Sequence, residues 1–147
     1  MKPTDDPNAK KDIVTVPYNG GTITGAREHI ERYIRIVSEQ KALRARWPED
    51  TREALTVLCK KFPTLRDADG VDPWNVDRFV AWLNGPAPGH GAAVAGRFVL
   101  GVWNRDTDWS EFGLRLPGKF DLFEALAVCD NAHRSAFLQW VIAPFWP

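Results

Sequence analysis

The sequence predicts a mainly α-helical protein: a compact bundle of about six helices with a short extended or hairpin arm at its N-terminus. Apolar residues recur at helical spacing along most of the chain after residue 25. Prolines and capping residues divide that stretch into segments of ordinary helix length. β-branched residues gather in only one short segment near the start. We therefore expect residues 1–24 to form a flexible leader and arm, and residues 25–147 to form a single α-helical domain.

Composition agrees with a single soluble domain. The chain has 147 residues, of which 44% are hydrophobic and 26% charged, and its 19 basic side chains balance 19 acidic ones. Cys59 and Cys129 lack the spacing of a metal site, so we expect two small buried thiols in a reducing compartment. No stretch resembles a signal peptide or a membrane-spanning helix. The sequence predicts a cytoplasmic protein with no cofactor, no metal and no membrane contact.

The arm is predicted from residues 13–24. Ile13 to Val16 are β-branched, and the dipeptide Asn19-Gly20 is a strong hairpin signal. Pro17 restricts the first run to an edge strand or an extended segment. Because an isolated hairpin is marginally stable in water, we expect the arm to lie on the helical body or on a partner.

Two helices are expected next, separated by a proline. Apolar residues keep helical spacing from Ala26 to Trp47, where Pro48 should end the first helix and stand in the first turn of the second. The apolar set of the second helix is Ala54, Leu55, Leu58, Cys59 and Phe62. The bundle therefore begins with two adjacent amphipathic helices.

The middle of the chain predicts a third and a fourth helix. Asp72 and Pro73 form a helix start signal, with the aspartate as N-cap and the proline at the first helical position. Residues 92–103 are apolar on nearly every side apart from Arg97, so this helix should lie at the centre of the bundle. Gly96 and Gly101 should allow neighbouring helices to approach closely.

The last third should contain a long irregular connection and two short helices. Residues 105–118 lack helical periodicity, and connections of that length tend to be functional or mobile. Asp121 is expected to cap a helix over 122–129, and Asp130 or Asn131 a helix over 132–142. An aromatic tail, Phe145-Trp146-Pro147, follows.

Catalytic motifs are absent from the sequence, which therefore predicts no enzyme. The densest polar cluster holds Cys129, Asp130 and His133. A thiol and an imidazole four residues apart meet only on one continuous helix, and the Asp130-Asn131 pair indicates a break. The simpler interpretation makes Asp130 a helix cap that satisfies His133 on a core-facing stripe. An enzyme that uses Asp130 and His133 is the last of our three hypotheses.

Tryptophan content supports the leading hypothesis. Seven tryptophans are present, and three of them fall at a helix start, in the long connection and in the tail. Exposed aromatic rings are typical of binding hot spots. We expect a non-enzymatic protein–protein interaction or accessory module that displays loop and terminal aromatics to a protein partner or to a second copy of itself. The candidate contact residues are Trp74, Trp109, Phe145 and Trp146.

Uneven charge supports the alternative hypothesis. Residues 27–66 carry a net charge of +4, from ten basic and six acidic side chains, and residues 67–147 carry −4, from six and ten. Such asymmetry is a reason to consider a nucleic-acid partner. A nucleic-acid-associated accessory protein would use Arg32, Arg35, Arg44, Arg46, Arg52, Lys60 and Lys61. Glu28 and Glu39 share the solvent side of the first helix and dilute this basic surface.

Overall fold

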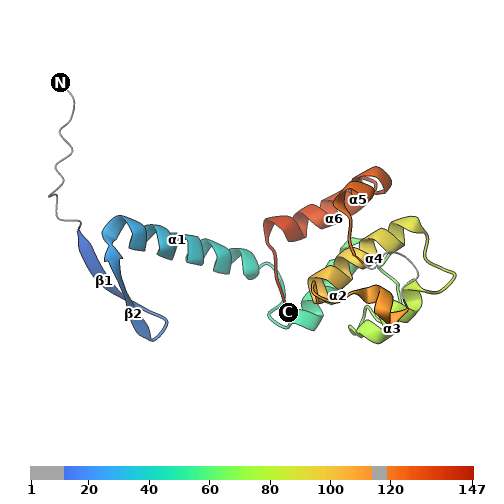
Figure 1. Ribbon diagram of the computed structural model, residues 1–147, viewed down its shortest axis with the longest axis horizontal. Coiled ribbons are helices and arrows are strands. Elements are labelled where there is room, and N and C mark those ends of the chain that lie inside the picture. The colour runs from blue at the N-terminus through green and yellow to red at the C-terminus, as the bar shows by residue number, and fades with distance from the viewer. Residues whose placement is uncertain (1–11, 114–118) are drawn as a thin grey trace, which may run out of the picture. The chain divides into compact units, whose positions relative to one another are not determined.

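The computed structural model describes residues 12–113 and 119–147. The described residues form six α-helices and one antiparallel hairpin (Figure 1), so the predicted fold class is confirmed. The chain divides into two compact units, Met1–Ala42 and Leu43–Pro147. This division falls inside the first long helix, whereas the boundary expected from the sequence lies after residue 24.

The N-terminal unit joins the hairpin to a helix. Strands β1 (Ile13–Tyr18) and β2 (Gly21–Ala26) pair antiparallel and in register from Ile13↔Ala26 to Tyr18↔Gly21. Asn19 and Gly20 both adopt positive φ, at 47° and 78°, which is the geometry of the expected tight turn. Helix α1 (Arg27–Arg44) follows directly, and the Tyr18 ring packs edge-on against Tyr33 at 5.6 Å. The hairpin therefore rests on the helix that follows it.

Two helix starts differ from the sequence prediction. Helix α2 (Thr51–Lys61) begins after Asp50, whose carboxylate accepts the backbone N–H groups of Arg52 and Glu53. Pro48 therefore lies before the helix and not in its first turn. Helix α3 (Val76–Leu83) begins after Asn75, which accepts the N–H of Arg78 at 3.0 Å.

The predicted start of α3 at Asp72 and Pro73 is wrong. The peptide bond between these two residues is cis, and the Asp72 carboxylate pairs with Lys60 of α2. An N-cap side chain accepts from backbone N–H groups two or three residues further along the chain. Asn75 stands directly before the helix and reaches such a group, whereas Asp72 lies too far from the first turn.

Helix α4 (His90–Trp103) is the centre of the C-terminal unit, as the sequence predicts. It contacts α2, α3 and α5, and ten of its residues are buried. A Cβ added at Gly96 would lie 2.5 Å from Leu83 of α3, so this glycine does permit close helix packing. No heavy atom lies within 4 Å of the corresponding position at Gly101, and the expectation of a close approach there is wrong.

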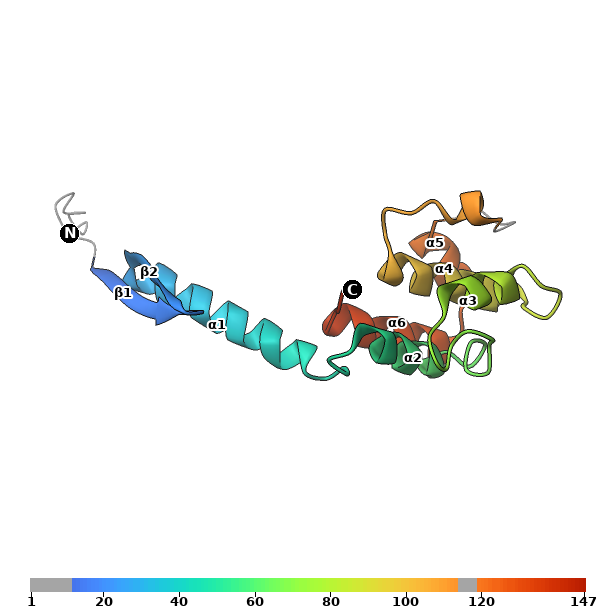
Figure 2. The same cartoon turned by 90° about the horizontal axis from the view of Figure 1, so that it is seen from below.

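The chain ends with a short 3-10 turn and two helices. The turn (Trp109–Phe112) lies in the predicted connection, of which residues 114–118 fall outside the described residues. Helices α5 (Leu122–Val128) and α6 (Asn131–Ile142) are capped by Asp121 and Asp130, as predicted. Helices α6 and α2 lie side by side (Figure 2). Both cysteines are buried, which confirms that expectation.

Candidate functional site

Three of the four aromatic residues expected to be displayed are buried. Trp74 and Trp109 each expose 6% of their surface, and Phe145 exposes 1%. Trp74 packs against Phe79 and Trp103, with ring centroids 5.2 and 5.9 Å away. The prediction that these three rings are displayed is therefore wrong. Aromatic rings stabilise a core through the large apolar area that they bury. These three rings reach the core although none of them belongs to an α-helix.

Phe145 is buried because the C-terminal tail folds back onto the unit. The Trp47 indole N–H donates to the carbonyl of Ala143 at 2.6 Å, and the Trp140 indole N–H donates to the carbonyl of Phe145 at 3.2 Å. The Phe145 ring then packs on Trp47 at 5.1 Å, beneath the guanidinium of Arg44 at 5.6 Å. Burying such a side chain contributes about 1.5–3 kcal/mol.

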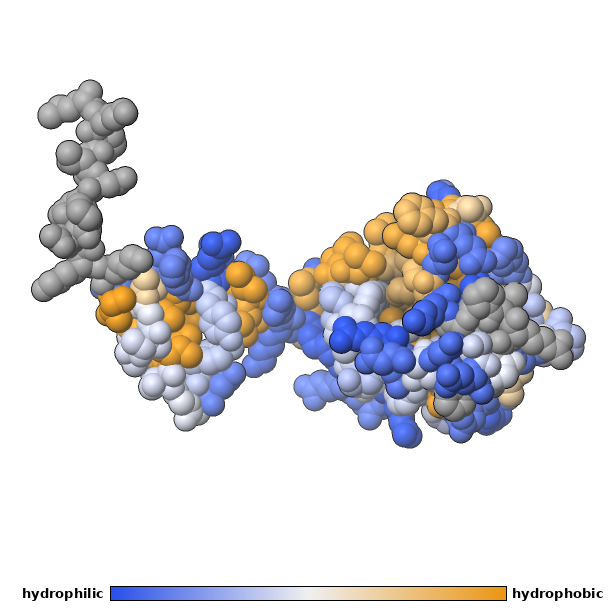
Figure 3. All heavy atoms as spheres, in the orientation of Figure 1, coloured by the Kyte–Doolittle hydropathy of each residue, from blue (hydrophilic) through white to orange (hydrophobic). Residues whose placement is uncertain are grey.

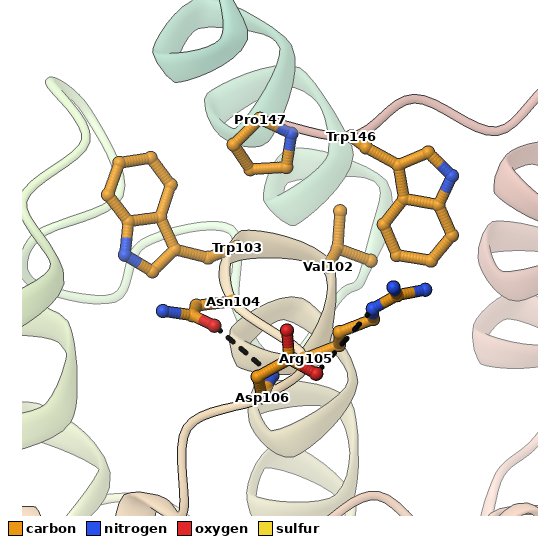
Figure 4. Close-up of a pocket in the computed structure, with 7 residues that line it drawn as sticks. All are labelled: Val102, Trp103, Asn104, Arg105, Asp106, Trp146 and Pro147. Atoms are coloured by element: carbon orange, nitrogen blue, oxygen red, sulfur yellow. Dashed lines mark hydrogen bonds and ion pairs between the residues drawn. The ribbon is translucent and has the colours of Figure 1, made fainter.

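Trp146 alone of the four is exposed, at 53%. Its ring packs edge-on against Trp140 at 4.9 Å, and the Arg105 guanidinium lies 6.0 Å from its centroid. The same indole borders a pocket of about 420 Å³ (Figure 4). In the close-up, Trp103 and Trp146 stand on opposite sides of the pocket, and the polar side chains that follow α4 lie along one edge. The pocket is lined by Val102, Trp103, Asn104, Arg105, Asp106, Trp146 and Pro147.

A larger apolar surface lies next to this tail. Twelve large hydrophobic side chains are exposed among the described residues, and eight of them belong to α5, α6 and Trp146. We call this set the α5–α6 face: Leu122, Phe123, Leu126, Val128, Leu138, Val141, Ile142 and Trp146. Hydrophobic atoms gather over these two helices in the space-filling view (Figure 3).

Sequence reasoning missed seven members of this face. The sequence did contain a sign of this face. Large apolar residues occur on several sides of α5 and α6, and only one side of each helix can pack against the core. In α5 only Ala125 is buried, while Phe123 is 83% exposed.

The seven basic residues of the alternative hypothesis are divided between the two units, and three of them contact other residues of the chain. Arg32 and Arg35 belong to the N-terminal unit, and the other five to the C-terminal unit. Arg44 donates to the carbonyls of Trp47, Pro48 and Glu49. Lys60 pairs with Asp72, and the Lys61 ammonium lies 5.5 Å from the Trp47 ring centroid. Arg46 and Arg52 are exposed.

His133 is the middle member of a hydrogen-bonded chain of three side chains. Asp130 Oδ1 accepts from the His133 backbone N–H at 3.0 Å and lies 2.7 Å from its ring Nδ1. These bonds hold the pKa of Asp130 below its ordinary value. The other ring nitrogen, Nε2, lies 2.8 Å from the hydroxyl oxygen of Thr64. The predicted capping role of Asp130 and the core-facing position of His133 are confirmed.

Cys129 takes no part in this chain. It ends α5, so a helix break separates it from His133 as expected, and burial raises the pKa of its thiol. Thr64 was missed by sequence reasoning. It lies 69 positions from His133, and no local pattern marks such a pair.

A second polar cluster satisfies the buried charge of α4. Arg97 is buried, and its guanidinium donates to Glu124 Oε1 at 3.0 Å. His90 Nε2 lies 2.8 Å from the same oxygen. The contacts with His90 and Arg97 lower the pKa of Glu124. Helix α5 is thus tied to α4 by the carboxylate that compensates Arg97.

Within residues 12–113 and 119–147, no three His, Cys, Asp or Glu side chains lie together as a metal site requires. None of the described helices combines the length and the hydropathy needed to cross a membrane. Comparison of the chain with protein families, with curated proteins and with solved structures finds no match.

Proposed function

We propose that the protein is a protein-interaction module that uses the α5–α6 face and whose partner is a second copy of the chain. The observation that supports this proposal is the concentration of exposed hydrophobic side chains on one pair of helices. Single exposed apolar residues are ordinary, whereas a contiguous patch of this kind marks an interaction surface.

The size of the face suits a stable interface. The exposed parts of its eight side chains amount to on the order of 800 Å², taking roughly 150–200 Å² for each fully exposed side chain. A specific interface of standard size takes about 800 Å² from each partner. The largest apolar patch on a typical monomer is smaller, at roughly 300–600 Å².

A second copy fits this surface because an apolar patch is complementary to itself. Two-fold packing places the same residues on both sides, and closed two-fold dimers are the commonest oligomers. The members of the face are uncharged, and the exposed Arg134 of α6, which lies beside them, already donates to the Leu126 carbonyl of α5. Trp146 stands at one end of the set and offers an aromatic anchor, which is the one part of the sequence-based hypothesis that exposure supports.

The test is the molar mass of the purified protein in solution across a range of concentrations, by sedimentation equilibrium. We expect a dimer for the natural chain and a monomer for the double variant Phe123→Glu and Val141→Glu. The matched control is Ile36→Glu, which places the same charge on an exposed isoleucine of α1 outside the face. It should remain dimeric. A natural chain that stays monomeric at about 100 μM, or a double variant that dimerises equally well, would overturn the proposal.

The nucleic-acid hypothesis makes a different prediction for the same sample. Binding to a DNA duplex would weaken with added salt, with a log–log slope of about −0.9 per phosphate contacted. It would also weaken in Arg46→Ala and Arg52→Ala, which replace two of the exposed basic residues that this hypothesis uses. Binding with both properties, together with a monomeric natural chain, would place that hypothesis first.

A further inference from the structure

We propose that Thr64 is a nucleophile that accepts an acyl group from an activated ester, with His133 as its general base and Asp130 as a positioning residue. The proposal is independent of the α5–α6 face. It opposes the expectation from the sequence that the chain is not an enzyme, and the experiment below decides between the two.

The two hydrogen bonds of the His133 ring place its proton on one nitrogen and its lone pair on the other. Asp130 Oδ1 lies 2.7 Å from Nδ1, and a carboxylate at that distance accepts the ring proton. In the tautomer that carries its proton on Nδ1, the ring has its lone pair on Nε2, which lies 2.8 Å from Thr64 Oγ1. A nucleophile bonded to a base that a third group orients is the arrangement by which hydroxyl groups are activated in proteins.

An acyl transfer of this kind requires a base that is held in place and a nucleophile that faces solvent. His133 is buried and packs against the Phe62 ring at 6.0 Å, so its orientation is restrained. Asp130 is held by its bond to the backbone N–H of His133. Thr64 is exposed, so an acyl donor would approach this residue from the solvent side.

The first turn of α4 lies beside Thr64. A Cβ added at Gly91 would stand 4.0 Å from Thr64 Cγ2, which is ordinary contact distance. The N-cap of α4 is Gly89, which offers no side-chain acceptor to the first backbone N–H groups of the helix. Such N–H groups at a helix start stabilise negative charge, including the charge that develops on a carbonyl oxygen under attack.

The reaction balances without an oxidant or a second reactant. Thr64 Oγ1 attacks the carbonyl carbon of the ester while its proton passes to His133 Nε2. The tetrahedral adduct collapses, the bond between the carbonyl carbon and the leaving oxygen breaks, and His133 returns the proton to the leaving alcohol. The products are an ester on Thr64 and the free alcohol, with no change in oxidation state.

The experiment treats the full chain with 4-nitrophenyl acetate and locates the acetyl group by peptide mass spectrometry over time. We expect acetylation of Thr64 in the natural chain and in Thr64→Ser, and none at that position in Thr64→Val. His133→Gln should slow acetylation of Thr64 by about 10²–10⁴-fold, the usual contribution of a general base. Thr15 and Thr24 are internal controls, because both are exposed and their hydroxyls lie 2.7 Å apart with no imidazole bonded to either.

Asp130→Asn tests the positioning role without removing the helix cap, since Asn caps as well as Asp. We expect slower acetylation of Thr64 at unchanged helix content. Nitrogen NMR of the His133 ring should also show a shift in which nitrogen carries the proton, a change that a purely capping role would not produce. Because this variant keeps the cap, it carries the test if His133→Gln does not fold.

Three results would overturn the proposal. They are acetylation of lysines alone, acetylation of Thr64 no faster than that of Thr24, and a rate at Thr64 that neither His133→Gln nor Asp130→Asn changes.

Discussion

His133 Nε2 lies 2.8 Å from the hydroxyl oxygen of Thr64, and the two residues belong to segments that only the packing of α6 beside α2 brings together. Thr64 follows the end of α2, while His133 stands in the first turn of α6. The Phe62 ring, two residues before Thr64, is fully buried and contacts both His133 and Phe137. The position of the threonine hydroxyl is therefore a consequence of core packing.

The two glycines of α4 should respond in opposite directions to the same substitution. Gly96→Ala places a Cβ 2.5 Å from a methyl group of Leu83, and we expect the overpacking cost of about 1–3 kcal/mol to exceed the gain in helix propensity, so that the free energy of unfolding falls. Gly101→Ala meets no atom within 4 Å and should stabilise the helix by about 0.5–1 kcal/mol. Urea unfolding of both variants gives the comparison. Equal effects of the same sign would contradict the packing at Gly96.

Trp74 offers a test of a buried donor. Its indole N–H is buried, with no hydrogen-bond acceptor among the described residues. Trp74→Phe removes that donor and keeps much of the ring, so we expect a change below about 1.5 kcal/mol. Trp74→Ala leaves a cavity and should cost about 3–5 kcal/mol. Thermal and urea unfolding measure both, and a Phe variant as unstable as the Ala variant would show that the N–H does have an acceptor.

The attachment of the C-terminal tail can be tested through Trp47. Trp47→Phe removes the indole bond to the Ala143 carbonyl and leaves a ring against Phe145. We expect a loss of about 1–3 kcal/mol, because the carbonyl is left buried without its donor. Limited proteolysis should then cut the last residues faster than in the natural chain. An unchanged cleavage rate would mean that the other tail contacts suffice.

Glu124 should make the protein less stable in acid. Its pKa in the folded chain is below the ordinary value, because His90 and Arg97 donate to its carboxylate. The folded state therefore binds fewer protons than the unfolded state around pH 4. The stability that this carboxylate contributes is full above its unfolded pKa, about 4.3, and is lost as the pH falls through its folded pKa.

Melting temperatures of the natural chain and of Glu124→Gln, measured from pH 7 to pH 3, check this prediction. We expect the natural chain to be more stable at pH 7 and the difference to narrow on acidification. A difference that stays constant over this range would show that the carboxylate charge contributes nothing.

Local sequence determined the elements whose causes lie within a few residues. The Asn19-Gly20 turn, the caps at Asp121 and Asp130 and the break after Cys129 all depend on neighbours in the chain, and the structure contains each of them. The central position of α4 was also predictable, because a helix that is apolar on every side has no face to turn to solvent. Where two local signals competed, as at Asp72 and Asn75, the sequence did not identify the one used.

Tertiary structure alone decided which aromatic rings are displayed, which apolar side chains remain exposed and which hydroxyl meets His133. Phe145 and Trp146 are adjacent and both aromatic, yet one is buried under the tail contacts of Trp47 and Trp140 while the other stays exposed. Burial depends on which distant surface a side chain meets, and no short-range pattern encodes that surface. Helices α5 and α6 likewise have more apolar sides than the core of the unit covers, so their periodicity indicates helices without indicating which face stays exposed.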